Sequence, residues 1–165
     1  MRRHIITAAV AVLLAAAPAA AAQAPSSADT AKAACQTEKH DMGTQVFKKT
    51  YAAKSTAKAM AACVAKAEPA AEEAAKNAAK ACKDERAADA DAFAKKYGSN
   101  KNKRNAYGKC VSQKVQETTD ETTEERVNAA RTCKAQRKDD KAGFEDQWGT
   151  KRNAFGKCVS ATAKA

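Results

Sequence analysis

The chain has no leucine or isoleucine after Leu14. Residues 23–165 contain only six valines, four phenylalanines, three tyrosines, two methionines and one tryptophan, whereas 34 residues of this stretch are alanine. Chains this poor in large apolar side chains do not normally build a self-sufficient hydrophobic core. The sequence therefore predicts that a stable fold needs a further source of stability.

The sequence also lacks the residue patterns of an enzyme. His40 is the only histidine after His4, and it has no partner at metal-ligand spacing. There is no Cys-x-x-Cys motif, glycine-rich phosphate loop or nucleophile elbow. The many carboxylates, such as Asp84 and Glu124, are typical of solvated helix faces. We therefore expect no enzymatic activity, no metal site and no cofactor.

The first residues follow the layout of a secretory signal peptide. A basic start at residues 1–4 precedes an apolar run at 5–17 and a small-residue stretch at 18–22. This pattern predicts a signal peptide at 1–22, cleaved after Ala22 or alternatively after Ala24, and a secreted protein. The apolar run is too short to favour the other interpretation, a retained membrane anchor. The remaining chain would carry 28 basic and 19 acidic residues, a net charge of +9.

Six cysteines are the chain's most informative residues. All follow the predicted signal peptide, and an even number in an exported protein indicates a disulfide framework. Each bridge closing a loop of nearly thirty residues contributes about 3–4 kcal/mol, which compensates for a thin core. Because Ala, Lys, Glu, Gln and Arg favour helix, the expected fold is all-α. The cysteines are Cys35, Cys63, Cys82, Cys110, Cys133 and Cys158.

An internal repeat divides the chain into three units. Lys103–Ser112 reads KRNAYGKCVS and Lys151–Ser160 reads KRNAFGKCVS, so the two segments differ at one position. A cysteine and two aromatic residues recur upstream at a spacing that places all three on one helix face. The first unit is a diverged copy. The recurring upstream residues are Cys35, Phe47 and Tyr51, then Cys82, Phe93 and Tyr97, then Cys133, Phe144 and Trp148.

Each unit is predicted to be a helical hairpin. Gly/Asn-rich turns are expected at 98–105 and 149–153, where the two copies differ in length. Pro69 is a signal for the start of unit 2, and Thr122 with Glu125 fits a capping box that would open unit 3. The predicted units are three tandem two-cysteine helical hairpins at 28–67, 69–117 and 120–162.

Glycines mark other expected features of the hairpins. Gly43 and Gly143 are candidates for breaks in the first helix of units 1 and 3, and Gly108 and Gly156 for close helix approach.

The repeat favours disulfides inside each unit, namely Cys35–Cys63, Cys82–Cys110 and Cys133–Cys158. One geometrical point opposes this pairing. Cys82 precedes the turn by more residues than Cys110 follows it, so straight helices would misalign the two cysteines by several ångströms. A broken first helix or a wide turn would remove the mismatch. A bridge between neighbouring units, such as Cys63–Cys82, is the alternative.

The repeated basic residues are the strongest indication of a partner. Two clusters on equivalent elements would suit an anionic polymer: a wall phosphate polymer, an acidic lipid surface or nucleic acid. Tyr107 and Phe155 lie in the same segments, but their phase with Cys110 and Cys158 places them in the core. The alternative is that these lysines serve only solubility. The candidate residues are Lys101, Lys103, Arg104, Lys109 and Lys114 in unit 2, and Lys151, Arg152 and Lys157 in unit 3.

The repeated pattern F-x3-[YW]-G followed by K-R-N-A-[FY]-G-K-C-V-S resembles small alanine- and lysine-rich exported proteins of high-GC Gram-positive bacteria. The resemblance covers units 2 and 3 closely and unit 1 weakly, because Met60-Ala61-Ala62-Cys63 departs from the pattern. It implies export and a repeated module, and it carries over no catalytic or binding residue.

The sequence favours one function and leaves two others open. The favoured hypothesis is a secreted, non-enzymatic, disulfide-stapled structural or binding module that contacts anionic envelope polymers through basic helices. The alternative is a secreted thiol, redox or stress-related protein with functional cysteines. A cationic toxin is a third possibility.

Overall fold

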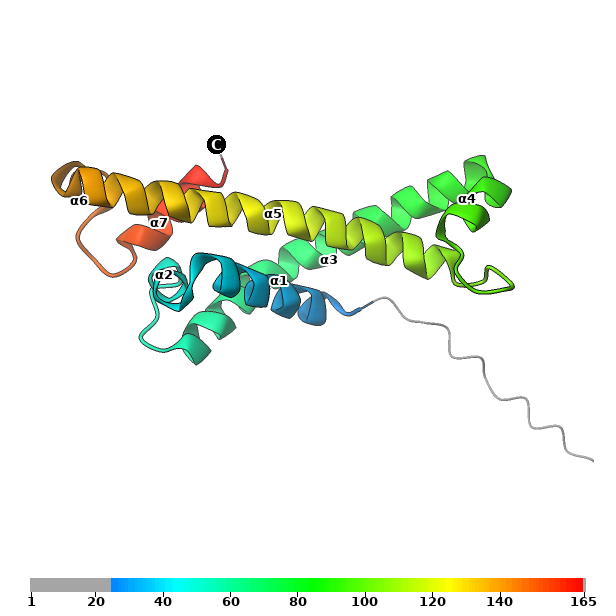
Figure 1. Cartoon of the computed structure of the whole chain (residues 1–165), viewed down its shortest axis with the longest axis horizontal. Helices are drawn as coiled ribbons and strands as arrows, with labels where there is room; N and C mark the ends of the chain where they lie inside the picture. The colour runs from blue at the N-terminus through cyan, green and yellow to red at the C-terminus, as the bar shows by residue number, and fades with distance from the viewer. Residues whose placement is uncertain (1–24, 165) are drawn as a thin grey trace, which may run out of the picture.

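The computed structural model describes residues 25–164, and these residues form an all-helical fold without strands, which confirms the predicted fold class (Figure 1). The predicted signal peptide at 1–22 lies outside the described residues. Within the described part, no helix is long and apolar enough to span a membrane. The helices are α1 (Ser27–Met42), α2 (Thr44–Thr50), α3 (Thr56–Ala88), α4 (Ala90–Tyr97), α5 (Ala106–Asp139), α6 (Lys141–Trp148) and α7 (Ala154–Thr162).

The three disulfides form inside the units, as the repeat predicts. The rival pairing of Cys63 with Cys82 is wrong. In every bridge the two Cα atoms lie 6.0 Å apart, and all six cysteines are fully buried. The bonds are Cys35–Cys63, Cys82–Cys110 and Cys133–Cys158.

A break in the first helix of each unit lets the cysteines meet. Gly43 separates α1 from α2 with φ 77°, in the left-handed region that glycine adopts without a Cβ clash. In units 2 and 3 the break lies at Asp89 and Asp140, each of which accepts a hydrogen bond from the backbone N–H three residues later. Gly143, predicted as the break in unit 3, is instead in the first turn of α6, where its N–H donates to Asp140.

Two long helices are shared between neighbouring units. The start predicted at Pro69 is wrong, because Pro69 lies inside α3, which runs from unit 1 into unit 2. The capping box predicted at Thr122 is also wrong. Its hydroxyl donates to the Thr118 carbonyl within α5, which joins units 2 and 3. Buried positions lie on both sides of each signal, Cys63 and Ala71 in α3 and Val115 and Thr123 in α5, so packing overrides the local start signals.

Units 1 and 3 pack against each other, whereas unit 2 lies at the far end of the molecule (Figure 1). Helix α1 packs against both α3 and α5, and α2 packs against α7. Met42 and Val46 of unit 1 contact the buried cluster around Cys133–Cys158 in unit 3. The backbone at Gly156 approaches the Thr50 carbonyl so closely that a Cβ would collide with it, as predicted for this glycine. The fold is therefore a two-unit body with one hairpin projecting from it.

Candidate functional site

The predicted basic residues do not form one patch. Those of unit 2 lie on and after the turn between α4 and α5, at one end of the molecule, and those of unit 3 lie on and after the turn between α6 and α7, at the other end (Figure 1). Seven of the eight are exposed, and Lys114 is half-buried. The exposed residues of unit 2 are Lys101, Lys103, Arg104 and Lys109, and those of unit 3 are Lys151, Arg152 and Lys157.

At the unit 3 end, the fold adds basic residues that the sequence analysis did not single out. Two adjoining hollows of about 220 and 200 Å³ lie between α2 of unit 1 and the helices of unit 3. Both hollows are lined by Lys49, Arg137 and Phe155, so they lie next to each other. We call the two hollows together the basic trough. Its basic residues are Lys49, Lys134, Arg137, Lys138, Lys151 and Arg152.

The charge of the basic trough is almost entirely positive. Glu145 is the one acidic residue in its lining, and this carboxylate lies 3.7 Å from the Lys141 ammonium. Within residues 25–164, none of the six basic side chains belongs to an ion pair. The Arg137 guanidinium lies 5.9 Å from the centre of the Phe144 ring. The trough thus presents uncompensated positive charge in a concave surface, which concentrates anions.

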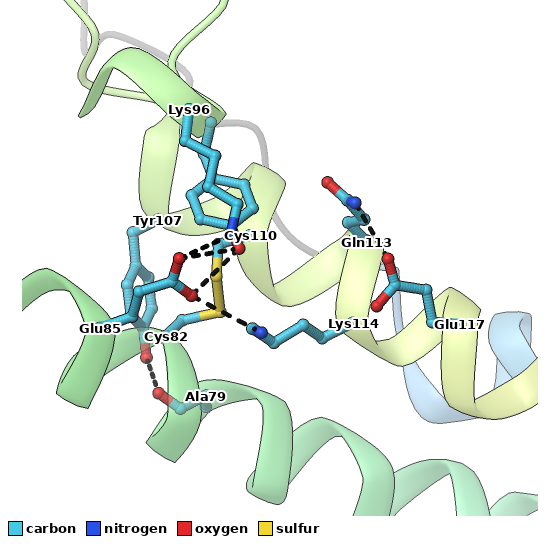
Figure 2. Close-up of a disulfide and its surroundings, with 10 residues drawn as sticks. Ala79, Cys82, Glu85, Lys96, Tyr107, Cys110, Gln113, Lys114 and Glu117 are labelled. Carbon is cyan, nitrogen blue, oxygen red and sulfur yellow. Dashed lines mark hydrogen bonds and ion pairs between the residues drawn. A yellow bond between two sulfur atoms is a disulfide. The ribbon is translucent and has the colours of Figure 1, made fainter. Parts of the chain in front are cut away.

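Two of the basic residues of unit 2 bind other groups of the same unit, unlike those of the basic trough. The Lys103 ammonium donates to the Gly98 carbonyl at 2.8 Å and so closes the turn. Lys114 on α5 lies 3.6 Å from the Glu85 carboxylate, and Figure 2 shows the two side chains pointing toward each other. Lys101 and Arg104 remain exposed. Unit 2 therefore offers fewer free cations than the basic trough.

The aromatic residues of both basic segments belong to the cores, as their phase predicts. Phe155 is 4 % exposed and lies in the cluster around Cys133–Cys158. Tyr107 is partly buried, and its hydroxyl donates to the Ala79 carbonyl at 3.0 Å (Figure 2). These rings anchor the helices rather than forming a stacking platform.

A glutamate three residues after the first cysteine anchors the aromatic stripe of units 1 and 2. In unit 2, the Tyr97 hydroxyl donates to both oxygens of Glu85, at 3.2 and 3.1 Å. The Lys96 ammonium donates to the same carboxylate at 2.8 Å (Figure 2). This hydrogen bond from Lys96, with that from Tyr97, holds the pKa of Glu85 below its ordinary value.

In unit 1 the equivalent glutamate is buried. Glu38 is 2 % exposed, and its two carboxylate oxygens accept from the Tyr51 hydroxyl at 2.8 and 2.9 Å. Arg126, from the α5 helix of the neighbouring unit, donates to the Tyr51 hydroxyl at 2.8 Å and lies 3.7 Å from Glu38. Burial raises the pKa of Glu38 despite these partners, and it also raises the pKa of Tyr51. The network ties units 1 and 3 together.

Unit 3 lacks this bond because both partners differ. Gln136 stands where units 1 and 2 have glutamate, and Trp148 stands where they have tyrosine. The Trp148 indole N–H is buried and has no hydrogen-bond partner among residues 25–164. The sequence signal for the repeated anchor was the pattern Cys-x-x-[Glu/Gln], which appears after the first cysteine of every unit.

The described residues form neither a candidate metal site nor a free thiol. No group of three or more metal-ligating side chains gathers in residues 25–164. His40 is exposed, and its ring nitrogen lies 2.8 Å from the adjacent Asp41 carboxylate. All six cysteines are paired, so the hypothesis of functional thiols has no free cysteine to rest on.

Comparisons with known proteins give no match: no family model, no curated protein and no solved structure is similar to this chain.

Proposed function

We propose that the protein is a secreted, non-enzymatic module that binds a linear anionic polymer of the cell envelope along the basic trough. The carrying observation is the trough itself, where six basic residues from two units line one concave surface beside a single acid. Three buried disulfides fit this role, because they maintain a fold with a thin core in an oxidising extracellular environment.

The shape of the trough favours a linear polymer over a flat membrane surface as the ligand. Its cations lie in a depression between α2 and the helices of unit 3, and a flat bilayer surface does not reach into a concave surface. A polymer with phosphates at regular intervals can follow the hollow and release counterions at several positions. A linear phosphate polymer is therefore the preferred ligand over an acidic lipid surface. Between the two linear polymers expected from the sequence, the predicted secretion favours a wall phosphate polymer over nucleic acid.

The test is binding of fluorescent polyphosphate to the disulfide-bonded protein over a range of salt concentrations. In the trough variant, Lys49, Arg137 and Arg152 are replaced by glutamine. The control variant replaces three exposed lysines of α1 and α3 outside the trough, Lys32, Lys58 and Lys83, and so loses the same charge. A plot of the logarithm of the binding constant against the logarithm of salt concentration has a negative slope. In the trough variant this slope should be less steep by about 2, as expected for three lost phosphate contacts.

The control variant should keep most of the wild-type affinity. Equal losses in both variants would show that net charge alone drives binding and would contradict the proposal. Tighter binding to vesicles of anionic lipid or to single-stranded DNA than to polyphosphate would contradict the choice of polymer.

A further inference from the structure

A second cavity lies where α1, α3 and α5 meet, away from the basic trough. Its volume is about 120 Å³, and it shares no lining residue with the trough. Small side chains leave this space open: Ala31 on α1, Ala71 and Ala74 on α3, and Thr119 and Thr123 on α5. Helices normally fill such a junction with leucine, isoleucine or valine, and the chain has none of these at the cavity.

One end of the cavity carries three charged groups, Glu38, Lys66 and Arg126. The Glu38 carboxylate is already occupied by the Tyr51 hydroxyl. The two cations exceed it by one positive charge. Within residues 25–164, the Lys66 ammonium has the Ser160 hydroxyl as its one hydrogen-bond partner, at 2.7 Å. Burial lowers the pKa of Lys66, and the nearby Arg126 lowers it further.

Threonines of α5 form a further wall of the cavity. Thr118, Thr119 and Thr122 direct their hydroxyls to carbonyls of the preceding turn of α5. Thr123, which is 6 % exposed, also lines the cavity.

We propose that this cavity binds a small organic anion, a carboxylate with a short apolar body. Its carboxylate would lie between Lys66 and Arg126, and its apolar body would contact the alanines of α1 and α3. An apolar cavity of about 150 Å³ holds benzene, so a cavity of about 120 Å³ suits a ligand of about six non-hydrogen atoms. Butyrate has this size and charge.

The test is a titration of the isotope-labelled, disulfide-bonded protein with butyrate, followed by amide NMR shifts at constant ionic strength. Butyramide is the neutral control of the same size. We expect saturable shifts confined to amides that line the cavity. Butyramide should bind at least tenfold more weakly, because the two cations attract the charged carboxylate of butyrate but not a neutral amide.

Variants separate the cavity from the rest of the surface. Ala70→Leu, at the exposed rim, fills the space and should weaken butyrate binding at least tenfold, whereas Ala81→Leu, exposed on α3 outside the cavity, should not. Lys66→Gln should weaken binding about fivefold, and Lys58→Gln should leave it unchanged. The trough variant should also bind butyrate normally.

Several results would overturn the proposal. These are the absence of saturable shifts at 50 mM butyrate, equal binding of butyramide, unchanged binding by Ala70→Leu, or shifts located at the basic trough. Because cavity and trough share no residue, failure of this proposal is distinguishable from failure of polymer binding.

Discussion

The half-buried Tyr51 and the buried Glu38 form a hydrogen-bonded pair, in which the hydroxyl is bonded to both carboxylate oxygens at 2.8 and 2.9 Å. The equivalent pair in unit 2, Tyr97 and Glu85, has similar geometry but lies closer to solvent, since the Glu85 side chain is 32 % exposed. The repeat thus supplies two versions of one hydrogen bond that differ chiefly in burial. Each version serves as the control of the other.

Removing the hydroxyl should cost more stability in unit 1 than in unit 2. Tyr51→Phe leaves the buried Glu38 without its closest donor, which we expect to cost about 1–3 kcal/mol of unfolding free energy. Tyr97→Phe should cost less, because Glu85 keeps Lys96 and is reached by water. Urea unfolding of the two variants measures the difference. Equal losses would show that burial of the glutamate is not the deciding factor.

The two glutamates should also give opposite pH dependences of stability. Burial raises the pKa of Glu38 above its ordinary 4.5, so its contribution is present below pH 4.5 and is lost as the pH rises through the higher folded value. Hydrogen bonds lower the pKa of Glu85, so its contribution is present above pH 4.5 and is lost as the pH falls.

Glutamine variants test these signs. Relative to wild type, Glu38→Gln should become more stable as the pH rises from 4 to 7, whereas Glu85→Gln should become less stable as the pH rises from 3 to 5. Thermal unfolding over this pH range measures both trends. A trend of the same sign in the two variants would refute the assignment.

Loss of the unit 2 disulfide should affect one end of the molecule. The double variant Cys82→Ala/Cys110→Ala opens a loop with a sequence separation of 28 residues, and we expect a cost of about 3–4 kcal/mol. Unit 2 projects from the body, so hydrogen exchange should accelerate in α4 and the adjoining ends of α3 and α5 while α1 and α7 stay protected. Uniform acceleration would mean that the three units unfold as one.

A methyl group at position 156 should separate units 1 and 3. In Gly156→Ala the Cβ meets the Thr50 carbonyl, which belongs to backbone and cannot rotate away. We expect a loss of about 1–3 kcal/mol and faster exchange in α2 and α7. Lys157→Ala, at the exposed neighbouring position, is the control and should change stability little. If Gly156→Ala left stability and hydrogen exchange unchanged, the two units would contact each other only loosely.

Sequence reasoning predicted the features that depend on local pattern. The all-α fold follows from helix propensity, and the turns at 98–105 and 149–153 follow from the difference in length between the two copies. The pairing of Cys82 with Cys110 follows from the repeat, although the spacing to the turn opposed it. The helix breaks at Asp89 and Asp140 have a sequence signal in the capping aspartates themselves, whereas the predicted breaks lay at glycines.

The missed features depend on contacts between units. Pro69 and Thr122 carry start signals, yet α3 and α5 continue through them because neighbouring units are packed on both sides. Lys49 and Arg137 lie 88 residues apart in the sequence and meet in the basic trough only because units 1 and 3 pack together. No pattern inside one repeat indicates that contact.

The shared helices fix the direction in which each hairpin points. Each residue of an α-helix turns the chain by about 100°, so inserting or deleting one residue between Cys63 and Cys82 would swing unit 2 around α3 by that angle. The same change in α5 would carry Cys133 away from unit 1 and dismantle the trough. Repeats that share helices therefore do not tolerate changes in the length between them, as repeats joined by flexible linkers do. A further repeat could be added only by a segment that preserves the helical phase.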